Sequence, residues 1–186
     1  YTLPDGTPTT NLTEVTAGET VGVVLRAGNL DVPQSATLGR LTIAEPGDPA
    51  AANNKFFDDD LIFGGFTSIA WPEGATGAAV TWTHAGGTTG PESFASGTVP
   101  APPAGVAITG FTIDFAGAIA PNSEAVIHYE LDSSSSDAFV APGQSKGPFR
   151  NVIDVTGERA GMDPVTVSAD ASVSYVAPRI EPTIEK

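Results

Sequence analysis

Hydrophobic and polar residues alternate along several short segments of this sequence. The longest run lies near the end, at "VTVSADASVSYV", where one side holds only apolar, small or aromatic residues: Val165, Val167, Ala169, Ala171, Val173 and Tyr175. The residues between them are threonine, serine or aspartate. A period of two residues is typical of a β-strand that buries one face and exposes the other to water.

Similar runs elsewhere predict further strands, among them "ETVGVVL", "GRLTIAE", "LIFGGFTSIAW", "GAAVTWTH", "SEAVIHYEL" and "FRNVIDV". Turn clusters rich in Gly, Pro, Asn and Ser separate them, such as "EPGDPAAANN", "HAGGTTGPE" and "LDSSSSD". No segment keeps a helical period of 3.6 residues over three turns. The sequence therefore predicts an all-β fold, an antiparallel β-sandwich of about ten strands that is Ig-like or jelly-roll-like.

One predicted strand changes phase in its middle. In "GVAITGFTIDFAG", the apolar residues of 106–108 follow one phase and those of 111–115 follow the other. The change falls at Thr109 and Gly110. An extra residue on one strand is a β-bulge, so we expect a bulge at this position.

The pattern favours a single sandwich over residues 1–176. An alternative is a division into two domains near residues 99–105, where "VPAPPAG" resembles a linker. The part after it offers few strands for a separate sandwich, which favours the single domain. Residues 177–186 carry two prolines and are expected to form a semi-rigid linker to a following module, with a plain C-terminal tail as the alternative.

Composition and charge narrow the classes of partner. The chain has 22 acidic and eight basic residues and a net charge of −14. Phosphate backbones and anionic membranes attract basic surfaces, so neither nucleic acid nor a membrane surface is an expected partner. No apolar run reaches the roughly 20 residues of a membrane span. The absence of cysteine and the abundance of Thr, Gly and Pro suit an exported bacterial protein, and Tyr1 suggests a mature fragment.

The densest group of oxygen ligands is a run of three adjacent acids, Asp58, Asp59 and Asp60. Asn53 and Asn54 precede it, and Glu45 and Asp48 lie further upstream. Calcium binds six to eight such oxygens, so this loop is a candidate calcium site. Its spacing is not that of an EF-hand, and a solvated acidic loop is the alternative. No other cofactor is expected.

Aromatic residues raise the possibility of carbohydrate binding. Trp71 precedes a proline at a strand end and is the candidate for stacking on a glycan, whereas Trp82 shares a phase with Val80 and is expected in the core. No G-x-S-x-G motif or histidine positioned to activate a serine is present. We therefore expect no catalytic residues, with a hydrolase fragment as a remote alternative.

Four stretches, in this order, carry a family resemblance: "GRLTIAEPGDP", "FTSIAWPEGATGAAVTWTHAGG", "ITGFTIDFAGAIAPNSEAVIHYEL" and "NVIDVTGERAG" with the alternating terminal run. Together they resemble the repeated Ig-like β-sandwich modules of large actinobacterial cell-surface proteins. The resemblance spans most of residues 38–186 and lies in strand and turn residues. It implies a sandwich architecture, a stalk role and no active site.

The resemblance also implies a covalent cross-link in some members, an isopeptide bond between a lysine and an asparagine. The chemistry needs a buried uncharged lysine, an acceptor carboxamide and a neutral acid beside them. Asn151 is the candidate acceptor and Lys146 the candidate lysine. The alternative for Asn151 is a residue that caps a turn through its own backbone.

These observations predict a non-catalytic structural module of a secreted or cell-wall-anchored bacterial surface protein. Its partners would be neighbouring modules of the same chain. The alternative is an adhesive or carbohydrate-binding sandwich with a host or glycan ligand.

Overall fold

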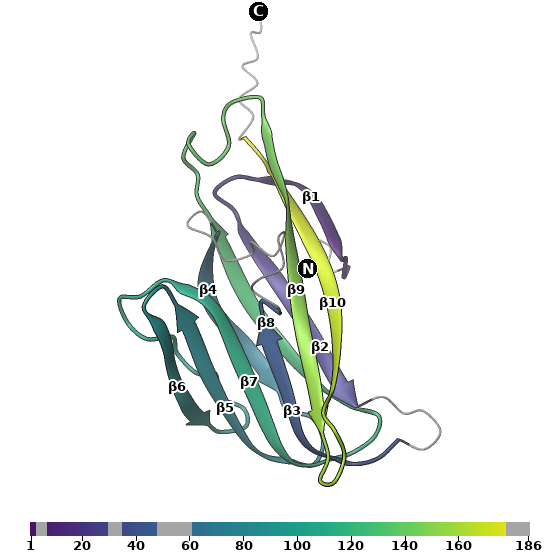
Figure 1. Cartoon of the computed structure of the whole chain (residues 1–186). Helices are drawn as coiled ribbons and strands as arrows, with labels where there is room; N and C mark the ends of the chain where they lie inside the picture. Colours follow the sequence, from purple (N-terminus) through teal and green to yellow (C-terminus); the bar gives the residue numbers. More distant parts are fainter. Residues whose placement is uncertain (3–6, 30–34, 48–60, 178–186) are drawn as a thin grey trace, which may run out of the picture.

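A computed structural model describes residues 1–2, 7–29, 35–47 and 61–177, and it consists of two packed β-sheets (Figure 1). The strands are β1 (Asn11–Thr16), β2 (Thr20–Asn29), β3 (Leu38–Glu45), β4 (Leu61–Ala70), β5 (Ala75–His84), β6 (Gly87–Phe94), β7 (Ile108–Ile119), β8 (Ser123–Ser133), β9 (Ser145–Glu158) and β10 (Val165–Val176). The described residues contain no helix. The predicted all-β class and sandwich architecture are confirmed.

The two sheets differ in size. The larger has seven strands in the order β1-β10-β9-β3-β7-β5-β6, and the smaller has three in the order β2-β8-β4. Every neighbouring pair is antiparallel except β1 and β10, which run parallel. The larger sheet draws strands from both sides of residues 99–105, since β7 pairs with both β3 and β5.

The core lies between the sheets and is formed by residues that follow the period of two. On β8 the predicted inward set is fully buried: Ala125, Ile127, Tyr129 and Leu131. Five aromatic rings from both sheets meet in its centre with neighbouring ring centroids 4.9–6.5 Å apart: Phe63, Phe66, Trp82, Phe111 and Tyr129. Edge-to-face pairs among them add to the hydrophobic free energy of the packing.

The predicted bulge in β7 is present. Thr83 of β5 pairs with Gly110, whereas the next residue, His84, pairs with Ile108, so Thr109 is the extra residue. The bulge lets Ile108 and Phe111 both face the core in spite of their odd spacing. Val106 lies before the strand and is 41% exposed.

The segment predicted as a turn, "HAGGTTGPE", contains most of a strand. β6 forms the outer edge of the larger sheet and is exposed along almost its whole length. Because it buries almost nothing, it has no alternation of apolar and polar residues. Pro91 is compatible with this place, since an edge strand has one row of backbone groups without a partner strand.

Candidate functional site

The polar residues that meet inside the core are the candidate functional site. Glu45 is the last residue of β3 and follows the inward phase of Leu41 and Ile43. Asn151 follows the inward phase of β9 between Phe149 and Ile153. The two strands pair antiparallel, and continuing their register places Glu45 opposite Ile153 and diagonal to Asn151.

A hydrogen-bonded triad joins the two sheets at this point. The Tyr129 hydroxyl of β8 donates to Oε1 of Glu45 at 3.0 Å, and Nδ2 of Asn151 donates to the same oxygen. Glu45 and Tyr129 are 1% exposed and Asn151 is 2% exposed. Bonds made in a low-dielectric interior are strong, so the triad fixes how the sheets lie on each other.

The carboxyl group of Glu45 is neutral near pH 7. Burial raises its pKa from the ordinary 4.5 to about 8, although the hydrogen bonds from Asn151 and Tyr129 act in the opposite direction. Oε2 of Glu45 and Oδ1 of Asn151 have no hydrogen-bond partner within the described residues. Both of these oxygens are acceptors, and a protonated Glu45 carboxyl supplies a donor beside them. This is consistent with the raised pKa of Glu45.

Two further phenols surround the triad. Burial raises the pKa of Tyr1 above its ordinary value, and the nearby Glu45 and Tyr175 raise it further. Burial likewise raises the pKa of Tyr175, which packs against Phe139 with ring centroids 5.3 Å apart. Among the described residues, the core of this sandwich therefore holds one acid, one amide, one serine hydroxyl and three phenols.

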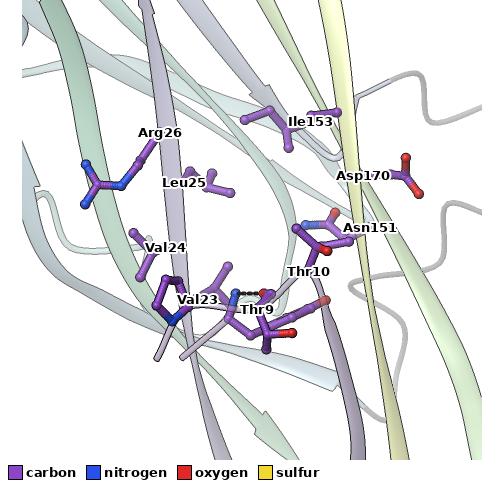
Figure 2. A pocket seen from close by; sticks show the side chains of 13 residues that line it. Thr9, Thr10, Val23, Val24, Leu25, Arg26, Asn151, Ile153 and Asp170 are labelled. Atoms are coloured by element: carbon purple, nitrogen blue, oxygen red, sulfur yellow. Dashed lines mark hydrogen bonds between the residues drawn. The ribbon is translucent and has the colours of Figure 1, made fainter. Parts of the chain in front are cut away.

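A cavity of about 560 Å³ reaches this cluster from the side of the sandwich (Figure 2). Figure 2 shows Leu25 of β2 on one side of the cavity and Ile153 and Asn151 of β9 on the other. Thr9 and Thr10 cover another side. The buried carboxyl and carboxamide could hold or pass a proton here, but their side chains are almost sealed from solvent.

The structure does not bring the two predicted isopeptide residues together. Lys146 lies five positions before Asn151 on β9, a separation of roughly 17 Å along an extended strand. Its ammonium group lies over the rings of Phe139 and Phe149, 4.7 and 5.8 Å from their centroids. Asn151 is bonded to Glu45 and not, as the alternative had it, to its own turn.

The predicted calcium ligands Asp58, Asp59 and Asp60 lie outside the described residues. Glu45, which the sequence grouped with this acidic stretch, is instead in the core because it continues the inward phase of β3. Over the ranges that the structure describes, no three residues of the types His, Cys, Asp or Glu lie close enough to hold a metal ion.

Trp71, the predicted glycan-stacking residue, is half-buried after the end of β4. Its ring packs edge-to-face on Phe94 and Phe115, with centroid separations of 5.9 and 6.0 Å. Trp71 thus contributes to packing between strands, and this position does not support a role in sugar stacking. Trp82 is fully buried, as predicted.

Sequence reasoning missed Glu45, Tyr129 and Tyr1 as members of a polar cluster. The period of two could have identified Glu45, because Leu41, Ile43 and Glu45 follow one another at every second position and share a face of the strand. No local signal identifies Tyr1, which reaches the core because Thr2 donates a backbone hydrogen bond to Gly22 of β2 at 3.3 Å.

Comparisons with known proteins assign no family. No family model matches the sequence, and no curated protein matches it. Among solved structures, it is similar to the collagen-binding subdomain ACE19 of the Enterococcus faecalis surface protein ACE. The TM-score is 0.40 at 10% identity, over 88% of this chain and 92% of that one.

No helix in the part of the chain that the structure describes could cross a membrane.

Proposed function

We propose that this chain is a non-catalytic structural module of a secreted or cell-wall-anchored bacterial surface protein, where it spaces or presents neighbouring modules. Such a module has to resist tension between its two ends and does not need an accessible reactive group. Both requirements can be compared with the structure.

The observation that carries the proposal is the pairing of the first and last strands. β1 and β10 run parallel and pair from Asn11 with Ser172 to Thr16 with Val176. Tension applied to the start of β1 and the end of β10 pulls these strands along their own axes in opposite directions. The hydrogen bonds between them are then loaded together in shear, whereas peeling would break them one at a time.

The buried triad supports the same role. Tyr129 and Asn151 both donate to one oxygen of Glu45, and each of the three residues is at most 2% exposed. Groups that a ligand in solution cannot reach serve the protein's own stability. By linking β3 and β9 to β8, they resist sliding of one sheet over the other.

Single-molecule force spectroscopy on a tandem array of the full chain tests this proposal. Ala17→Pro removes the backbone donor to the Val176 carbonyl, a 2.9 Å bond next to the β1–β10 ladder. Thr98→Pro removes a comparable 3.1 Å bond to Ala95 in a turn and is the matched control. We expect the unfolding force to fall in the first variant and to stay at the wild-type value in the second.

Equal unfolding forces in the wild type and both variants would contradict a mechanical role for the terminal strands. Thermal melting of each variant checks that it has folded. Since forced unfolding depends on the unfolding rate, loading rates must be the same in all measurements.

The second candidate is an adhesive module with a host or glycan ligand. The cavity of about 560 Å³ between β2 and β9–β10 favours it, because ligand sites are concave and largely apolar. Glycan-array binding that is lost in Ile153→Lys and kept in Trp71→Ala would support this function at the cavity. No binding by the wild type would reject it.

A further inference from the structure

Three of the most exposed large apolar side chains lie together at one end of the larger sheet. Val165 and Val167 at the start of β10 are 65% and 61% exposed, and Met162 in the preceding turn is 63% exposed. Single exposed apolar residues are common on proteins, but a contiguous group marks a surface that something covers.

These valines belong to the core-facing side of β10. They share a phase with Val173 and Tyr175, which are fully buried further along the same strand. The smaller sheet ends at its edge strand β2, and Val165 and Val167 line the cavity beside that edge together with Gly28 and Asn29. We call this uncovered set the β10 flank: Val165, Val167, Ala169 and Ala171.

Two cavities follow one another along the β10 flank. The first, the cavity of Figure 2, is lined by Ala169 and Ala171, and the second, of about 390 Å³, by Val165 and Val167. The neighbouring strand β9 lines both cavities as well. Asn151 and Ile153 line the first cavity, and Val155 and Gly157 line the second. Together they form a groove with an apolar floor along seven residues of β10.

The opposite wall of the groove is a strand edge along which no strand of the described residues pairs. β2 is the edge strand of the smaller sheet, with Val23–Arg26 along the first cavity and Gly28 and Asn29 along the second. At one end of this edge, Gly22 already accepts a backbone hydrogen bond from Thr2. The edge therefore accepts extended backbone, and the groove lies where a fourth strand of the smaller sheet would add to β2.

We propose that this groove binds the C-terminal segment of a second copy of this chain, residues 179–185, as an added β-strand. In "RIEPTIE" the residues Ile180, Pro182 and Ile184 alternate with Arg179 and three other polar residues. Its seven residues span roughly 23 Å, which equals the length of the β10 flank. The alternate apolar side chains of this segment cover the floor of the groove while its backbone pairs with β2. Addition of a strand to a sheet edge is a known mode of peptide recognition.

The proline is compatible with this position. An added strand at the edge of a sheet pairs on one side only, so Pro182 can direct its missing donor toward solvent. In the proposed strand, Arg179 and Glu181 would both lie on the solvent face and carry opposite charges.

The donor is another copy because a chain's own residues 179–185 cannot lie along the groove. The last described residue, Ala177, follows the end of β10 that lies farthest from Val165 (Figure 1). The nearest residue of the β10 flank, Ala171, lies six residues before Ala177, roughly 20 Å along the strand, whereas the two residues from Ala177 to Arg179 reach at most about 7 Å. β1 also occupies the edge of β10 from Ser172 to Val176, between Ala177 and the β10 flank.

The resulting contact is head-to-tail. Copies therefore add in series as an open filament, and a ring forms only if the rotation between successive copies closes. This inference goes beyond the proposed function, which concerns tension within one module. Its failure would leave the shear pairing of β1 and β10 untouched.

Titration of a fluorescent peptide of residues 178–186 into the full chain tests the proposal by fluorescence anisotropy. We expect saturable binding that is at least tenfold weaker for a peptide carrying Ile180→Ser and Ile184→Ser. Val167→Lys in the protein should weaken binding to a similar extent. Ile62→Lys, on the outer face of β4 and 50% exposed in the wild type, is the matched control and should leave binding unchanged.

Sedimentation velocity of the full chain is the second measurement. We expect concentration-dependent assemblies that the free peptide dissociates. No peptide binding at about 1 mM would overturn the proposal, as would equal binding by Val167→Lys with a wild-type melting curve. Self-association that persists when the chain carries Ile180→Ser and Ile184→Ser would assign the β10 flank to symmetric pairing and also overturn it.

Discussion

At the centre of the sandwich Glu45 is 1% exposed, and at its flank Val165 is 65% exposed. The centre buries an acid, an amide and phenols, while the flank leaves valines in water. Both regions belong to strands whose inward faces alternate regularly. The two regions differ in what packs against them, since the three strands of the smaller sheet cannot cover all seven strands of the larger sheet.

The comparison shows that residue type does not decide burial in this fold. Val167 and Val173 have the same side chain, the same strand and the same face, yet one is 61% exposed and the other is fully buried. The position of each valine relative to β2 decides whether its side chain is buried. The centre can therefore hold polar groups only because they bond each other, and the flank can expose apolar groups only until a strand covers them.

The largest expected effect is a pH dependence of stability that originates at the centre. The folded state holds the proton of Glu45 more tightly than the unfolded state, because its pKa is about 8 against an ordinary 4.5. The free energy of unfolding should therefore fall as pH rises through this interval, by up to about 5 kcal/mol, and level off above it.

Urea denaturation of the wild type and Glu45→Gln between pH 4 and pH 9 measures this effect. The glutamine variant cannot ionise, so the difference between the two curves should change in favour of the variant as pH rises. Parallel curves would mean that Glu45 ionises as readily in the folded state as in the unfolded state.

Removing the amide partner should have the next largest effect. Asn151→Ala leaves Glu45 with one donor fewer and opens a small cavity, so we expect a loss of about 2–3 kcal/mol at pH 5. Since the Asn151 hydrogen bond lowers the pKa of Glu45, its loss should also move the pH-dependent decline to higher pH. Unchanged stability would indicate that the triad contributes nothing to the fold.

The matched valines of β10 test the contrast directly. Val173→Ala should cost about 2 kcal/mol because it leaves a cavity in the core. Val167→Ala should change the free energy of unfolding by less than about 0.5 kcal/mol at low protein concentration. Urea denaturation measures both free energies of unfolding. If the two substitutions destabilise the protein equally, the β10 flank is already covered in a single copy.

The smallest expected effect concerns one hydroxyl group. Tyr129→Phe keeps the aromatic packing and removes the donor to Glu45, for a loss of about 1 kcal/mol. Tyr175→Phe is the control, because within the described part of the chain the Tyr175 hydroxyl has no hydrogen-bond partner. Its thermal melting curve should be equal to or above that of the wild type.

Local patterns predicted much of this fold. The period of two identified the buried faces of β2, β5 and β8, and a change of phase identified the bulge at Thr109. It did not identify β6, since an exposed edge strand has no buried face to alternate. For β10 it predicted one buried side throughout, but only Val173 and Tyr175 are fully buried.

The candidate site was less accessible to prediction because its members come from distant parts of the sequence. Glu45 lies 84 positions from Tyr129 and 106 from Asn151. The sequence predicts that each faces inward, but not that they meet. Asn151 was singled out for a bond to lysine, and the phase of Glu45 with Ile43 was the unused clue to its actual partner.

The place of β3 in the larger sheet has a consequence for the order of folding. β3 lies between β7 and β9, and Arg40 pairs with Glu158, which is synthesised 118 residues later. Pairing over such separations pays a large loop-closure entropy before it is rewarded, so this sheet should assemble slowly. In a nascent chain β3 has no sheet partner until β7 has been synthesised, and its second edge stays open until β9 follows, so the larger sheet closes late.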